Sequence, residues 1–164
     1  MNQQRHIVLP ILVLLLAAGC EQNAERADKR PLIVTSILPL AQWSRAVGGD
    51  DVRLLTLLPA NANPHTFELL PRQIEDAADA RLLLFIGAGL EPWADKLASN
   101  LRDADARRLQ LSDGEELLQD THDHGHDHAR QGHALGNPHL WLDPQFAIRA
   151  VERIRDALIA QVPE

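Results

Sequence analysis

Apolar runs and amphipathic stretches alternate along the chain after residue 30. Runs with the length and composition of buried strands lie at 32–36, 52–58 and 82–86, and a fourth lies at 108–111. Uninterrupted apolar runs of this kind are typical of parallel sheets, whose strands are covered on both faces. The pattern therefore predicts a sheet of about four parallel strands.

Helical periodicity between these runs predicts helices over 40–47 and 71–80 and a third that begins at Pro92. The clearest helix comes last, where Asp143 is placed to cap it and Pro144 to form its first turn. Its core-facing stripe is expected to consist of Ile148, Val151, Ile154, Leu158 and Val162. Strands that alternate with helices predict an α/β fold, a parallel sheet flanked by helices with right-handed crossovers.

The amino-terminal residues have the pattern of an export signal. A polar start containing Arg5 leads into the apolar stretch 7–18, which at about 12 residues is shorter than the roughly 20 that span a membrane. Small residues then precede Cys20, the only Cys in the chain. We expect a lipoprotein signal peptide over 1–19, lipidation of Cys20, and a protein anchored to a membrane in the periplasm or at the cell surface. Ordinary signal cleavage beside an incidental Cys is the alternative.

Polar residues at 20–30 show no periodicity and predict a flexible tether. The remaining residues, 31–164, are expected to form one domain, because there is enough chain for one core and not for two. A net charge of -7, with 16 basic residues scattered among 23 acidic ones, argues against nucleic acid as a partner.

Histidines are concentrated late in the chain, in a His-rich loop at about 112–136. The Gly and Asp content of its residues 120–136 predicts that this part is disordered without metal. Imidazole binds zinc, copper and nickel at neutral pH. A flexible loop must be ordered to chelate a metal, so modest affinity and low selectivity are expected. The alternative is a solvated loop without a role. The candidate auxiliary ligands are His122, His124, His126, His128 and His133.

His65 and His139 differ from the loop histidines because each follows a Pro and precedes apolar residues. Proline stiffens the turn, and the apolar residues can anchor it to the core. A rigid turn can hold an imidazole at about 2.0–2.1 Å from zinc. Ligands in parallel α/β folds bind at the carboxyl ends of strands, and the segment with His65 directly follows the second predicted strand. We expect both histidines at that edge, close enough to share an ion; an ordinary surface position is the alternative.

Several segments together resemble the metal-receptor lipoproteins of bacterial ABC importers for zinc and manganese. The similar segments are Val34–Leu40, Val47–Asp50, Leu58–Glu68, Gly87–Trp93 and Asn137–Pro144. The His-rich loop is similar to one in the zinc branch. The resemblance implies two α/β lobes joined by a long helix, with metal in the cleft between them, and His65 and His139 as ligands. It departs mildly at Asn63, where the family often has Asp.

The resemblance also departs in length, because family members are roughly twice as long and their second lobe supplies a His and an acidic ligand. We therefore expect this chain to be the amino-terminal lobe of a receptor that passes zinc to an ABC permease. Manganese is less favoured because it prefers oxygen ligands. A truncated inactive relic, or an anchored scavenger that uses the His loop, stays open. A zinc hydrolase is disfavoured because no His-Glu-x-x-His is present, so no enzyme activity is expected.

Overall fold

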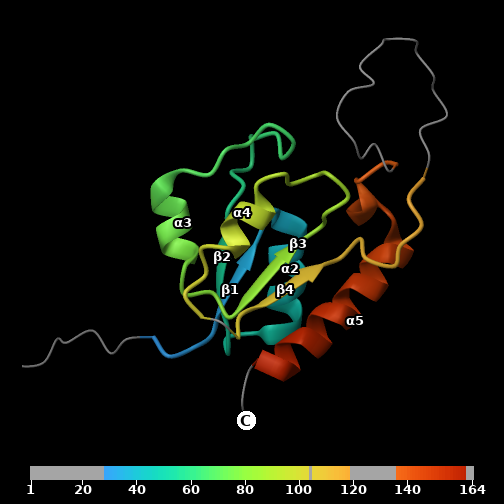
Figure 1. The fold of residues 1–164 in the computed structure, drawn as a ribbon. Helices are drawn as coiled ribbons and strands as arrows, with labels where there is room; N and C mark the ends of the chain where they lie inside the picture. The colour runs from blue at the N-terminus through green and yellow to red at the C-terminus, as the bar shows by residue number, and fades with distance from the viewer. Residues whose placement is uncertain (1–27, 104, 119–135, 162–164) are drawn as a thin grey trace, which may run out of the picture.

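The computed structural model describes residues 28–103, 105–118 and 136–161 (Figure 1). The strands are β1 (Leu32–Thr35), β2 (Arg53–Thr56), β3 (Leu82–Phe85) and β4 (Arg107–Gln110). The helices are α2 (Leu38–Gly48), α3 (Pro71–Ala77), α4 (Ala94–Ala98), the short 3-10 helix η1 (Leu140–Leu142) and α5 (Pro144–Gln161). No helix in these ranges is both long and apolar enough to cross a membrane.

The four strands form one sheet in the order β2-β1-β3-β4, and every neighbouring pair is parallel. The predicted parallel α/β fold is therefore confirmed. The central strands β1 and β3 are buried along their whole length, as the apolar runs predicted. The edge strand β2 is only half-buried and β4 is partly exposed, because each has a neighbouring strand on one side only. The prediction that every strand is buried on both faces was therefore wrong for the edge strands β2 and β4.

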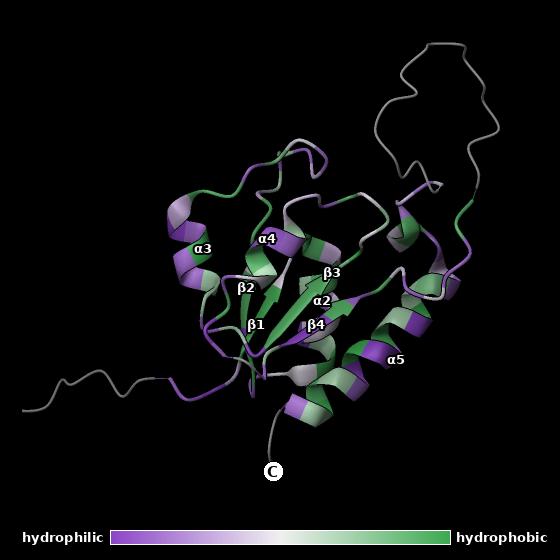
Figure 2. Cartoon of the chain, viewed as in Figure 1, coloured by the Kyte–Doolittle hydropathy of each residue, from purple (hydrophilic) through white to green (hydrophobic). Residues whose placement is uncertain are grey.

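Helices cover both faces of the sheet, which makes three layers. Leu40 of α2 and Phe146 of α5 pack with Ile33 and Leu84 on one face. Ala77 of α3 and Leu97 of α4 pack on the other. Figure 2 shows the apolar strands β1 and β3 between these layers. The chain thus leaves β1 toward one face and leaves β3 toward the opposite face.

Helix α5 begins where the sequence predicted, and its cap is confirmed. The Asp143 carboxylate accepts hydrogen bonds from the backbone N–H groups of Gln145, at 2.9 Å, and Phe146, at 3.3 Å. The predicted core stripe is partly wrong, because Ile148 is 55% exposed and Val151 only half-buried. Val162 lies outside the described residues. The buried side chains are Phe146, Ala150, Ile154, Ala157 and Leu158.

The smaller helices are shorter than predicted. Helix α3 ends at Ala77, and α4 begins at Ala94 instead of Pro92 and ends at Ala98. Leu101 therefore lies after the end of α4. Of the expected tether, residues 28–30 are described, and the Arg30 guanidinium donates to the carbonyl of Asp50 at 2.9 Å.

Arginine side chains fasten α5 to the chain that follows β4. The Arg153 guanidinium donates to the carbonyls of Gln110 (2.9 Å), Leu111 (2.8 Å) and Asp113 (3.1 Å).

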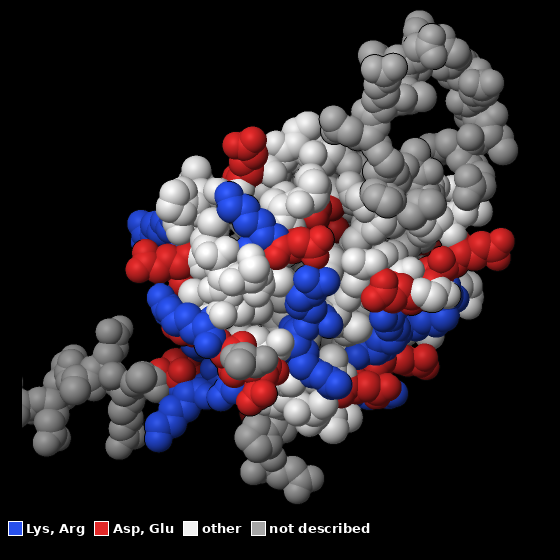
Figure 3. Space-filling model, viewed as in Figure 1, with Lys and Arg blue, Asp and Glu red and all other residues white. Residues whose placement is uncertain are grey.

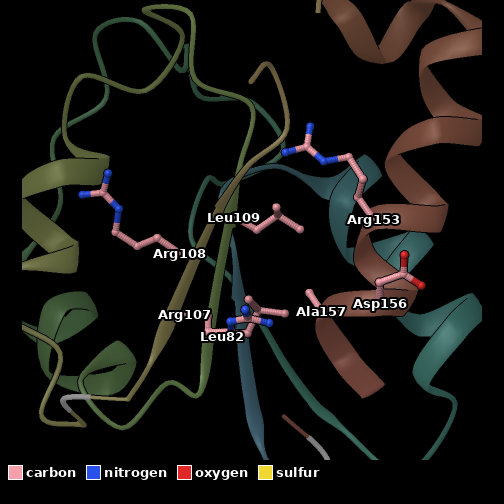
Figure 4. A pocket seen from close by; sticks show the side chains of 7 residues that line it. All are labelled: Leu82, Arg107, Arg108, Leu109, Arg153, Asp156 and Ala157. Carbon is pink, nitrogen blue, oxygen red and sulfur yellow. The ribbon is translucent and has the colours of Figure 1, made fainter. Parts of the chain in front are cut away.

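A groove of about 300 Å³ lies between β4 and α5, lined by Leu109 and Ala157 and flanked by arginines (Figure 4). Figure 3 shows basic and acidic side chains interspersed on this side of the molecule.

Candidate metal centre

The segment that carries His65 connects β2 to α3 and rises above the carboxyl edge of the sheet (Figure 1). Its base is closed by the side chain of Gln73. The Gln73 amide donates to the carbonyl of Leu57 and accepts from the backbone N–H of Leu70, both at 3.0 Å. The two ends of the segment are thereby held together, which restricts the positions open to His65.

Two further contacts fix the middle of this segment. The Asn63 side-chain oxygen accepts a hydrogen bond from the backbone N–H of His65 at 3.0 Å, which forms an Asx turn. Phe67 packs edge-on against Trp93, with ring centroids 5.9 Å apart and planes at 77°. Trp93 is only 7% exposed, so it gives Phe67 a fixed surface. The predicted apolar anchor after Pro64-His65 is therefore present.

His139 lies in a second turn of the same design, just before η1 and α5. The Asn137 side-chain oxygen accepts from the backbone N–H of His139 at 3.0 Å and lies 2.6 Å from its Nδ1. The backbone N–H of Asn137 donates to the carbonyl of Leu118 at 2.8 Å. The imidazole also lies beside the indole of Trp141, with ring centroids 5.1 Å apart.

These contacts set the tautomer of His139. The Asn137 oxygen is identified as the acceptor atom because a backbone N–H, which can only donate, points at it. Nδ1 must then carry the hydrogen in the short contact with the same oxygen. Nε2 of the neutral ring is left with a free lone pair. A hydrogen bond of this kind on one ring nitrogen is the usual support for a histidine that binds metal through the other.

The rings of His65 and His139 lie together, with centroids 5.7 Å apart and planes at 62°. Two imidazoles on one tetrahedral zinc, with nitrogens at 2.0–2.1 Å, would have centroids about 5 Å apart. Both residues are exposed, so an ion can reach them. The predicted proximity of the two histidines is confirmed, and their role as metal ligands stays a prediction.

The described surroundings of the pair contain no further cluster of metal ligands. Among residues 28–103, 105–118 and 136–161, no group of three or more His, Cys, Asp or Glu side chains is arranged to hold a metal. A cavity of about 390 Å³ beside His139 is lined by Glu116, Asp143 and the exposed Leu142. The described part of the chain thus offers two imidazoles on an open surface.

A buried carboxylate lies at the same edge of the sheet and was missed from the sequence. Glu91 is only 5% exposed. Burial raises the pKa of its carboxyl group, and hydrogen bonds from Ser36 and from the backbone of Gly87 and Ile86 oppose that rise. The available signal was a Glu within an otherwise apolar stretch, two residues after Gly89.

Support of the two histidines by Asn63 and Asn137 was also not predicted from the sequence. Their signal was the repeated tripeptide Asn-Pro-His, since Asn commonly accepts hydrogen bonds from the backbone two residues later. The remaining candidate residues lie outside the described part of the chain: Cys20, His122, His124, His126, His128 and His133.

Comparison with known proteins finds one matching family model. The family described as ZnuA, zinc-uptake complex component A, periplasmic, matches residues 33–164. The zinc-binding lipoprotein AdcA of Streptococcus pneumoniae is 30% identical over 161 residues, which cover 96% of this chain and 32% of AdcA. The manganese-binding lipoprotein MntA of Halalkalibacterium halodurans is 29% identical, over 94% of this chain and 48% of MntA.

A solved structure agrees with these matches. The Zn(II)-bound ZnuA-like domain of Streptococcus pneumoniae AdcA superposes with a TM-score of 0.64 and 28% identity, over 82% of this chain and 45% of that domain. The chain therefore spans half or less of the length of these relatives. The likeness covers both turns that carry the histidines, since the family match runs from residue 33 to residue 164.

Proposed function

The chain belongs to the ZnuA family of metal-binding receptors, and we propose that it captures zinc outside the cytoplasm for an ABC permease. Proteins of this family bind metal ions and are not enzymes, so the hydrolase alternative is set aside. We further propose that residues 31–164 form one lobe of such a receptor, tethered by residues 20–30 to a lipidated Cys20 once the signal peptide 1–19 is removed. This arrangement would hold the lobe at a membrane surface outside the cytoplasm.

The observation that supports this proposal best is the pair of histidines at the carboxyl edge of the sheet. Their centroid separation of 5.7 Å is close to that of two imidazoles on one ion, and Asn137 leaves Nε2 of His139 free. We propose His65 and His139 as the metal ligands and Zn²⁺ as the captured ion.

The relatives include both zinc-binding and manganese-binding proteins, so the choice of metal rests on the donor atoms. Imidazole nitrogen suits zinc, whereas manganese is better served by carboxylate, carbonyl and water oxygens. We propose the histidines at 122, 124, 126, 128 and 133 as auxiliary zinc ligands of low selectivity.

The small number of ligands predicts weak binding by this chain alone. Structural zinc sites have four ligands and catalytic ones usually three from protein, whereas the described residues offer two imidazoles. The other positions would be filled by water on an open surface. The same observation favours one alternative, an anchored scavenger that relies on its additional histidines.

Zinc titration can test the proposal if the histidines of the loop are removed. We call the full chain with His122, His124, His126, His128 and His133 replaced by Asn the loop-silent chain. In competition with a chelator of known affinity, it should bind one zinc weakly, and His65→Ala or His139→Ala should abolish that binding. Manganese should bind more weakly still.

Three results would change the conclusion. Zinc binding unaffected by His65→Ala and His139→Ala would refute the proposed ligands. Binding at nanomolar strength would refute the argument from ligand number and make the single lobe a sufficient site. If loss of the gene does not slow growth of the host on chelator-treated medium, the chain is better explained as an inactive relic than as a receptor.

A further inference from the structure

We propose that Glu91 is a positioning residue that holds the segments of His65 and His139 at metal-binding separation. This inference rests on the function proposed above and assigns a role to Glu91, the one buried carboxylate among the described residues. Glu91 does not touch the imidazoles in any contact found among the described residues, so it acts through the segments that carry them.

Glu91 fills the crevice at the switch point of the sheet. The chain leaves β1 toward α2 on one face and leaves β3 toward α4 on the other, and such a divergence opens a crevice at the carboxyl ends of the two strands. The Glu91 carboxylate joins the two sides. Oε1 accepts from the Ser36 hydroxyl at 2.5 Å and the Ile86 N–H at 3.0 Å, and Oε2 accepts from the Gly87 N–H at 2.9 Å.

Two paths lead from Glu91 to the His65 segment. The carbonyl of Ser36 accepts from the N–H of Leu58 at 3.0 Å, and Leu58 lies near the start of that segment. Trp93, two residues after Glu91, is the surface on which Phe67 packs. A shift of Glu91 would therefore move both the start of the segment and the anchor beside His65.

A third path leads to the His139 segment. The carbonyl of Ile86 accepts from the N–H of Ser112 at 2.9 Å. Ser112 leads to Glu115, whose carboxylate forms a two-pronged ion pair with Arg149 of α5. The chain then reaches Leu118, whose carbonyl receives the N–H of Asn137.

The close approach along this third path depends on Gly87. A Cβ at Gly87 would lie 2.4 Å from the side chain of Gln110 and 2.8 Å from the Ser112 hydroxyl. The φ of Gly87 is +83°, a value that also favours glycine. The turn is thus shaped to bring the chain after β3 against the chain after β4.

A carboxylate is a costly way to fill a crevice. Burial disfavours its charged form, and apolar side chains of similar volume often stabilise a fold at least as well. Glu91 can, however, accept hydrogen bonds from both sides of the crevice at once, which an apolar side chain cannot. That property suits a residue that sets a distance between two segments.

Zinc affinity of the loop-silent chain tests this role. The variants are Glu91→Ala, Glu91→Gln and Ser36→Ala. The control is Leu82→Ala, because Leu82 is fully buried but begins β3 at the opposite edge of the sheet. Each affinity is measured by chelator competition at a temperature where circular dichroism shows every variant folded.

Glu91→Ala should lower zinc affinity about 10-fold or more, as loss of a supporting residue around metal ligands typically does. Glu91→Gln and Ser36→Ala should lower it less, because each keeps some of the contacts. Leu82→Ala should leave the affinity within about twofold of the parent despite its loss of thermal stability. Equal losses in Leu82→Ala and Glu91→Ala would overturn the proposal. If Glu91→Ala does not fold, parental affinity in both Glu91→Gln and Ser36→Ala would overturn it.

A measurement without metal separates this proposal from the proposed function. In the metal-free parent, nuclear Overhauser contacts between the rings of His65 and His139 should be visible, and they should weaken in Glu91→Ala but not in Leu82→Ala. If zinc binding does not depend on His65 while these contacts respond as stated, the proposed function fails and the positioning role stands. If the contacts are the same in every variant, the positioning role fails.

Discussion

Asn137→Ala offers a sharp test of the metal centre because the chain contains its own control. Asn63 and Asn137 occupy the same place in identical Asn-Pro-His tripeptides, and each accepts the backbone N–H of its histidine at 3.0 Å. Only Asn137 also lies within hydrogen-bond distance of an imidazole nitrogen, at 2.6 Å. Asn63→Ala removes the turn contact alone, whereas Asn137→Ala removes the turn contact and the support of His139.

The expected difference follows from the value of one hydrogen bond. A neutral hydrogen bond contributes about 0.5–1.5 kcal/mol net, and 1.4 kcal/mol corresponds to about tenfold in affinity. A metal on Nε2 would withdraw electrons from the ring and strengthen donation by Nδ1–H, so the upper end of this range applies. Asn137→Ala should therefore lower zinc affinity about tenfold more than Asn63→Ala.

The assay is chelator competition on the loop-silent chain, together with nitrogen NMR of the imidazoles. The parent should show His139 protonated on Nδ1, and Asn137→Ala should show a mixture of tautomers. Equal losses of zinc affinity in Asn63→Ala and Asn137→Ala would refute the reasoning. So would a parent His139 that carries its hydrogen on Nε2, because that nitrogen would then have no lone pair for the metal.

Other predictions concern stability and anchoring. Burial raises the pKa of Glu91, so the stabilisation from its bound proton is complete below the unfolded pKa and is lost as pH rises through the folded pKa. Urea unfolding should therefore show that the free energy of unfolding falls with rising pH in the parent but not in Glu91→Gln. The same dependence on pH in both proteins would contradict this. Arg153→Ala, which removes donors to three carbonyls, should lower the free energy of unfolding by about 2 kcal/mol. Arg155→Ala, which removes an exposed pair with Asp156, should change it little, and similar losses in both would count against the fastening of α5. Cys20→Ala should abolish lipid labelling and release the protein from membranes, whereas normal membrane retention would refute lipidation.

The fold could be predicted where hydrophobicity alone decides the structure. The run at 82–86 became the fully buried strand β3 because a central parallel strand needs apolar side chains on both faces. The face of α5 could not be read in the same way. The helix carries apolar residues on more than one side, and packing against α2 and the sheet selects the stripe of Phe146, Ala150 and Ile154 and leaves Ile148 exposed.

The candidate site, too, could be predicted from the sequence only in part. The proximity of His65 and His139 could be predicted, because both lie in Pro-containing turns that were expected at the carboxyl edge of the sheet. The topology of a parallel sheet brings such turns together. The contacts of Glu91 and Asn137 could not, since they depend on hydrogen bonds between segments far apart in sequence or on the rotamer of a single ring. Periodicity carries no information about either.

The hydrogen bond between Leu118 and Asn137 has a consequence for how this chain can evolve. Because the Asn137 N–H donates to the Leu118 carbonyl at 2.8 Å, positions 118 and 137 are neighbours in space, next to the turn that carries His139. The entropy cost of closing a loop grows only slowly with its length, about 0.6 kcal/mol for each doubling. Insertions or deletions between these two positions should therefore change the free energy of folding little.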